Sequence, residues 1–105
     1  MTEKYDDPFS FDSEKIRIGD RICDGFYISA VPAPLLMIRA PSGGFLMCGY
    51  LDMAAAEKLG ASAAKVKGVS SFEEMLSAEV ADVSPAAEEK GVSKGMTGRE
   101  ALRLL

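Results

Sequence analysis

The chain has 105 residues, of which 48% are hydrophobic and 27% charged, a balance typical of one compact globular domain and not of a disordered chain. It contains no histidine, which excludes Ser–His and Cys–His nucleophile pairs and every metal site built on imidazole. Its two cysteines, Cys23 and Cys48, form no CxxC motif, so we expect neither a zinc site nor a disulfide framework. No spacing of acidic residues demands a metal ion, and we expect no cofactor.

The formal net charge of −4 arises in the first segment of the chain. Residues 1–14 carry five acids and one base, whereas residues 15–105 carry eleven of each. No element has the basic excess that binding to nucleic acid or to an anionic membrane requires, and no apolar stretch approaches the ~20 residues of a membrane span. We therefore expect a cytoplasmic protein with a single domain over 15–105 and an acidic segment over 1–14 that can be removed with little loss of stability.

The first predicted elements are two strands with one face in water. From Lys15 to Ile22, isoleucines alternate with charged residues, which is the two-residue period of a half-buried strand. The pair Asp24-Gly25 then favours a hairpin turn, and a second strand is expected over Phe26–Val31.

Two continuously apolar strands are expected next, at the centre of the sheet. Pro32 and Pro34 end the preceding strand, and the runs Leu35–Ile38 and Phe45–Cys48 follow without alternation. A strand without alternation is normally buried on both faces. Something must then cover the second face of these strands, either the N-terminal hairpin folded over it or an identical subunit.

The rest of the chain alternates between short helices and strands. Helices are predicted to start at the N-caps Asp52, Ser71, Ser84 and Thr97, each a side-chain oxygen placed before helix-forming residues. Ser71 and Thr97 also have glutamate three residues later, which is the pattern of a capping box. Two further strands are expected, at Ala63–Val69 and Glu79–Val83. This order indicates an α+β domain with a mixed sheet of about five or six strands and short helices packed mainly on one face.

Four short segments carry a resemblance to a known family. They are Ala33-Pro34-Leu35-Leu36, Leu46-Met47-Cys48-Gly49-Tyr50-Leu51, Lys67-Gly68-Val69 and the string GMTGREAL from Gly95 to Leu102. Through them the chain resembles the YunC-like family of small uncharacterised prokaryotic proteins, a domain of unknown function. The resemblance extends from Lys15 to Leu102 and leaves out the acidic segment. It implies a small mixed α/β fold, and it implies no catalytic residue.

Cys48 is the first candidate site residue. It lies where a buried strand leads through Gly49 and Tyr50 to a helix N-terminus, and such positions can lower the pKa of a thiol and make it a nucleophile. Core packing is the alternative, because cysteine is among the most buried residue types and no histidine is present to act as its base. If a ligand binds here, we expect Gly49 and Tyr50 to line its site.

A glycine-rich helix start is the second candidate, because it resembles a cradle for an anion. Its residues are Gly95, Thr97, Gly98 and Arg99. Backbone N–H groups and an arginine at a helix start suit a carboxylate or phosphate, and we hypothesise that this segment faces the same site as Cys48. The segment lacks the GxxxxGK[ST] order of a phosphate-binding loop, and a turn followed by a capping box explains the same residues.

Two classes of function fit these features. The first is a small binding or assembly domain that forms a homo-oligomer, in which an identical subunit covers the apolar strands. The second is a small cytoplasmic enzyme that acts on an anionic small molecule, with Cys48 as nucleophile or with Arg39, Lys94 and Arg99 holding the anion. Arg39 also fits an exposed strand end. The sequence does not decide whether the chain is an enzyme.

Overall fold

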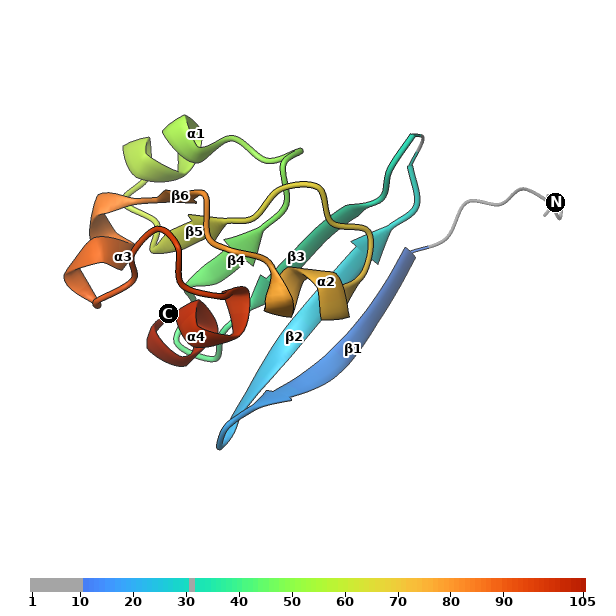
Figure 1. The fold of residues 1–105 in the computed structure, drawn as a ribbon, viewed down its shortest axis with the longest axis horizontal. Helices are drawn as coiled ribbons and strands as arrows, with labels where there is room; N and C mark the ends of the chain where they lie inside the picture. Colours follow the sequence, from blue (N-terminus) through green and yellow to red (C-terminus); the bar gives the residue numbers. More distant parts are fainter. Residues whose placement is uncertain (1–10, 31) are drawn as a thin grey trace, which may run out of the picture.

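Within the residues that the structure describes, 11–30 and 32–105, the chain forms six strands and four short helices (Figure 1). The structure is a computed structural model. The strands are β1 (Phe11–Ile18), β2 (Arg21–Ile28), β3 (Leu35–Arg39), β4 (Phe45–Met47), β5 (Ala63–Lys65) and β6 (Asp82–Val83). The helices are α1 (Met53–Lys58), α2 (Phe72–Ser77), α3 (Pro85–Glu89) and α4 (Gly98–Leu104). None of these helices is long and apolar enough to cross a membrane.

The six strands lie side by side in chain order and form one mixed sheet. Neighbouring strands are antiparallel except β4 and β5, which run parallel and are joined through α1. A parallel pair needs such a crossover because both strands must start at the same edge of the sheet. The α+β class and the mixed sheet are therefore confirmed, and so is the central position of the two apolar strands β3 and β4.

The first hairpin turns at Gly19-Asp20, so the turn predicted at Asp24-Gly25 is wrong. Gly19 has a φ of 63°, a left-handed conformation that glycine adopts without steric penalty. The pair Asp24-Gly25 lies instead in the middle of β2, where both residues pair with β1. The sequence therefore contains two glycines that could each begin a turn, and only one is used for that purpose.

The absence of a side chain at Gly25 allows Ile16 and Phe72 to pack closely against β2. A Cβ atom at this position would lie 2.7 Å from Cδ1 of Ile16 and 3.0 Å from the ring of Phe72. Because Phe72 is the first residue of α2, the missing side chain gives this helix room to approach the sheet.

Three strand ends differ from the prediction. β1 begins at Phe11, so residues 11–14 of the expected acidic segment belong to the sheet, while residues 1–10 lie outside the described part of the chain. β5 ends at Lys65, and the chain turns at Gly68, whose φ is 70°. β6 is shorter than expected because Glu79 pairs with Thr97 in an isolated bridge instead of with β5.

The predicted N-caps are confirmed. The side chains of Asp52, Ser71, Ser84 and Thr97 each accept a backbone N–H from the first turn of their helix. Thr97 and Glu100 form a complete capping box, in which the Glu100 carboxylate accepts the N–H of Thr97 at 2.8 Å. Glu74 departs from this pattern, because its carboxylate accepts the N–H of Ser70 at 2.7 Å and not that of Ser71.

The main core lies between the sheet and helices α2, α3 and α4, so the helices pack mainly on one face, as predicted. Its fully enclosed side chains include Leu36, Ile38, Leu46, Met75 and Leu102. On the opposite face, α1 covers β4 and β5 through a smaller cluster of Met47, Met53, Ala56 and Ala63. Each central strand therefore has apolar partners on its main face, and β4 has them on both.

The face of β1, β2 and β3 that points away from the main core is not covered by any helix of the described residues, and we call it the outer face. It carries the apolar side chains Phe11, Ile22, Phe26, Ile28 and Met37, which the cross-strand register places on one side of the sheet. Phe11 is 63% exposed and Ile22 44% exposed, and neither core cluster of the described residues includes any of the five. The N-terminal hairpin extends the sheet, so the alternative in which it folds over the apolar strands is wrong.

Candidate functional site

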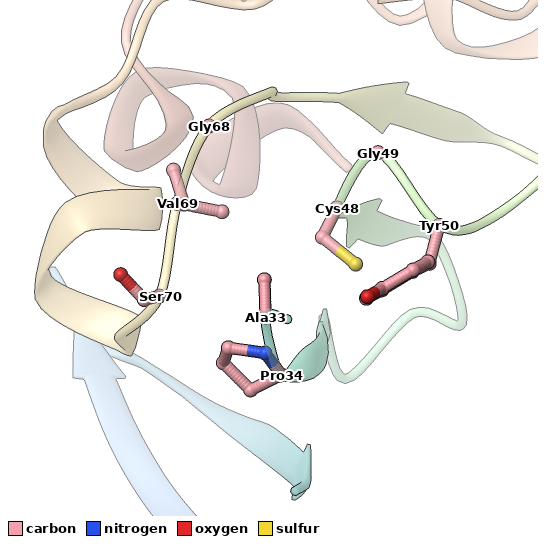
Figure 2. A pocket seen from close by; sticks show the side chains of 8 residues that line it. All are labelled: Ala33, Pro34, Cys48, Gly49, Tyr50, Gly68, Val69 and Ser70. Carbon is pink, nitrogen blue, oxygen red and sulfur yellow. The ribbon is translucent and has the colours of Figure 1, made fainter. Parts of the chain in front are cut away.

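A pocket of about 390 Å³ lies beyond the carboxyl ends of the parallel strands β4 and β5. Three segments line it, as Figure 2 shows: Ala33-Pro34, which precede β3, Cys48-Gly49-Tyr50, which follow β4, and Gly68-Val69-Ser70, which follow β5. They meet because β3 runs antiparallel to β4, so that its start lies at the same edge of the sheet as the ends of the parallel pair. Ligands of α/β proteins commonly bind at this position, beyond strand carboxyl ends.

Cys48 forms the wall of the pocket nearest the core. The residue is 3% exposed and belongs to the main core cluster, yet its sulfur points into the pocket (Figure 2). Its Sγ accepts the backbone N–H of Leu36 at 3.3 Å, and its own N–H donates to the Leu36 carbonyl at 3.2 Å. The core interpretation of Cys48 therefore describes its packing correctly, and the same side chain also faces the pocket.

Tyr50 and Gly49 border the pocket on the solvent side. Tyr50 is 49% exposed, and Figure 2 shows its phenol pointing into the space between Cys48 and Pro34. No atom lies within 4 Å of the position that a Cβ on Gly49 would take, so this glycine leaves the pocket open above Cys48. The pocket thus has an apolar floor with one thiol and a mouth with one phenol.

Ser70 connects the pocket to a carboxylate. The Glu74 side chain accepts the backbone N–H of Ser70 at 2.7 Å and its hydroxyl at 3.0 Å. These bonds join the loop after β5 to the first turn of α2 and hold the far wall of the pocket in place.

The glycine-rich helix start does not join this site. Thr97 and Arg99 line a different hollow together with Glu73, Leu76 and Ser77. The backbone N–H groups of this segment already have partners within the protein. Those of Gly95 and Gly98 donate to the carbonyl oxygens of Val80 and Ala78, and that of Thr97 donates to the Glu100 carboxylate. The hypothesis of one site shared by Cys48 and this segment is therefore wrong, and the capping box explains these residues.

The three cations proposed to hold an anion are not gathered. Arg39 lies on the outer face, where its guanidinium donates to Asp24 at 3.1 Å, and the ion pairs from Lys15 and Arg39 hold the pKa of that carboxyl below its usual value. Arg99 lines the hollow beside α2, and Lys94 is exposed in the loop before α4. None of the three lines the pocket at Cys48.

The described residues offer no cluster of three or more cysteines and acids that could hold a metal ion. Cys23 is free and fully buried, and burial raises the pKa of its thiol. It lies in the main core away from the pocket lining, so it has the properties of a structural cysteine.

Sequence reasoning found one side of the pocket and missed the other two. Cys48, Gly49 and Tyr50 are among its lining residues, whereas Ala33-Pro34 and Gly68-Val69-Ser70 were not singled out as site residues. The missing signal was the parallel pairing of β4 and β5, which places the chain after β5 beside the chain after β4.

The fold and the pocket together define a small α+β domain with a hollow beyond a parallel strand pair. The family model described as "Domain of unknown function (DUF1805)" matches residues 47–105, and the chain belongs to this family. It is 41% identical over 76 residues to the "Uncharacterized protein YunC" of Bacillus subtilis (strain 168), a match that covers 69% of this chain and 75% of that protein. The predicted YunC-like resemblance is confirmed.

A solved structure shows the same fold. The crystal structure of "a Protein of Unknown Function TA1206 from Thermoplasma acidophilum" matches with a TM-score of 0.88 and 33% identity, over 95% of this chain and 97% of that chain. The names of these relatives assign no activity, so the function of the chain has to be argued from its own site.

Proposed function

We propose that the chain is a small-molecule-binding domain and that the pocket at the ends of β4 and β5 is its binding site. One observation carries this proposal: seven of the eight lining residues belong to the segments on which the family resemblance rests, and Ser70 is the eighth. These segments are separate in the sequence and meet at the pocket. Its volume of about 390 Å³ falls within the range of about 300–1,000 Å³ typical of ligand sites.

The proposal is tested by recording amide shifts in NMR spectra while a library of small neutral and charged fragments is added. We expect the shifts to gather at residues 48–50 and 68–70. Ala33→Leu should abolish them by filling the pocket, whereas Ala54→Leu on the exposed side of α1 should not. Shifts that gather elsewhere, or that survive Ala33→Leu, would overturn the proposal.

A reactive thiol at Cys48 is the second candidate function, favoured by the direction of its sulfur. Iodoacetamide separates a reactive thiol from a merely enclosed one, and Cys23 is the internal control because it lies in the core away from the pocket lining. A binding pocket predicts that Cys48 is alkylated before Cys23 but more slowly in the folded chain than in urea. A catalytic thiol predicts alkylation in the folded chain at neutral pH that is at least as fast as in urea.

We also propose that the chain self-associates through the outer face and that it works in the cytoplasm. The apolar side chains of the outer face lie on three adjacent strands, and in a two-fold dimer one such patch packs against the same patch of a second copy. The cytoplasmic location is supported by Cys23 and Cys48, which are both free thiols. Fractionation of cells that express the chain tests the location.

A further inference from the structure

The pocket lining determines which class of molecule it suits. Its eight residues include no lysine, arginine, aspartate or glutamate. One lining residue is bonded to a carboxylate, because Glu74 accepts the N–H and the hydroxyl of Ser70. An anionic ligand would therefore find no compensating cation among the lining residues, and the carboxylate closest to the lining by hydrogen bonding, the exposed Glu74, carries the same sign of charge.

The shape of the lining favours an apolar group beside an aromatic ring. Ala33, Pro34 and Val69 form the aliphatic walls, and the phenol of Tyr50 lies at the opposite side (Figure 2). A flat apolar group fits between aliphatic walls and an aromatic ring because both surfaces contact its faces. The volume of about 390 Å³ corresponds to roughly a dozen water molecules of about 30 Å³ each, so the ligand is small.

The polar groups that face the pocket are few. The Sγ of Cys48 already accepts the N–H of Leu36. Tyr50 is half exposed, its hydroxyl makes no hydrogen bond to another residue within 11–30 and 32–105, and a phenol both donates and accepts. A ligand with one hydroxyl or carbonyl oxygen would satisfy this group.

Resting on the proposed function, we infer that the natural ligand is an uncharged small molecule with a flat apolar part and one hydrogen-bonding oxygen directed at Tyr50. The inference differs from the anionic small molecule that the sequence offered as one alternative. It follows from the uncharged lining, from the carboxylate bonded to Ser70 and from the phenol at the mouth, none of which depends on the reactivity of Cys48.

Three probes with the same ring and different charge test this inference: benzyl alcohol, benzoate and benzylammonium. We expect benzyl alcohol to shift the amides of residues 48–50 at concentrations at least tenfold lower than either ion, and to slow the alkylation of Cys48. Tyr50→Phe should weaken the binding of benzyl alcohol about fivefold, which is the effect of losing one hydrogen bond. Glu74→Gln, which keeps an acceptor for Ser70, should strengthen the binding of benzoate without strengthening that of the other two probes.

The outcomes distinguish the ligand class from the function. If benzoate or benzylammonium binds at the pocket as tightly as benzyl alcohol, the inference of an uncharged ligand is wrong. The proposed binding function is not affected by that result. The same conclusion holds if library fragments bind at the pocket and benzyl alcohol does not, or if Tyr50→Phe has no effect on benzyl alcohol. If neither the library nor the three probes shift the pocket amides, the binding function itself is wrong.

Discussion

At the scale of single residues, the glycines show how one residue type serves different physical needs. Gly19 is required for its backbone conformation, whereas Gly25 and Gly98 are required because no side chain fits. Gly98 was interpreted from the sequence as part of an anion cradle. In the structure a Cβ on it would lie 2.1 Å from the Met75 carbonyl oxygen, so the glycine allows α4 to pack against α2.

Gly98→Ala should therefore lower the free energy of unfolding by about 3 kcal/mol, because a backbone oxygen cannot move aside as a flexible side chain can. Urea denaturation measures the change. Gly49→Ala is the matched control, since nothing lies within 4 Å of its Cβ position, and it should stay within about 0.5 kcal/mol of the wild type. An equal effect of the two substitutions would contradict the packing role of Gly98.

The ion pairs of Asp24 predict that the stability of the chain depends on pH. Hydrogen bonds from Lys15 and Arg39 lower its pKa in the folded chain, so its contribution to stability is complete above the unfolded-state pKa of about 4 and is lost as pH falls through the lower, folded-state pKa. Asp24→Asn should have a lower urea midpoint than the wild type at pH 7, and the difference between the two midpoints should become smaller below pH ~4. Glu57→Gln on α1 is the control. A difference independent of pH would contradict the prediction.

At the scale of elements, Arg21 ties the start of β2 to the end of α4. Its guanidinium donates to the backbone oxygens of Leu102 at 2.8 Å, Arg103 at 3.0 Å and Leu105 at 3.4 Å, and to the hydroxyl of Ser42 at 3.0 Å. The last carbonyls of a helix have no partner within the helix, and a cation there also meets the negative end of the helix dipole.

Arg21→Ala should lower the free energy of unfolding by about 2 kcal/mol, because hydrogen bonds from a charged donor to the helix end are lost. Arg21→Lys should recover part of the loss, since a lysine cannot reproduce the fork of donors. Arg17→Ala on the exposed part of β1 is the matched control and should change stability by less than about 0.5 kcal/mol. Urea denaturation measures all three, and a large effect of Arg17→Ala would contradict a specific role for Arg21.

The true start of β1 changes what is expected of truncation. Residues 11–14 pair with residues 25–28 of β2, although the sequence placed them in the removable segment. A chain that starts at Lys15 should be less stable than one that starts at Phe11 by about 2 kcal/mol, because several ladder hydrogen bonds are lost. Thermal and urea denaturation of the two truncated chains measure this difference. Equal stability would show that the first half of β1 adds nothing to the sheet.

At the scale of the whole molecule, local patterns predicted well and long-range contacts did not. The N-caps, the apolar central strands and the α+β class follow from neighbouring residues, and all were predicted. The position of Gly95 relative to Cys48 and the closeness of Gly68 to Cys48 depend on strand order and direction, which no local pattern specifies. The hairpin turn failed for a similar reason, since the need for Gly25 arises from Phe72, a residue far away in the chain.

The open outer face leads to the last prediction, which concerns assembly. Within the described residues, the helices cover the main face of the sheet, and the apolar side chains of the outer face stay partly or largely exposed, as a surface for a second copy would be. Sedimentation at micromolar concentration should therefore show a species at least twice the mass of the 11.2 kDa chain. Phe26→Lys in the middle of this face should shift it to the monomer mass by burying a charge in the interface.

Leu59→Lys provides the control for that experiment. Leu59 is 84% exposed at the C-cap of α1, outside the outer face, so its substitution also replaces an apolar side chain with lysine and adds the same charge without touching the proposed interface. The assembly should therefore survive in Leu59→Lys and be lost in Phe26→Lys. A wild-type chain that sediments as a monomer would refute self-association, and loss of assembly in both variants would place the contact elsewhere on the surface.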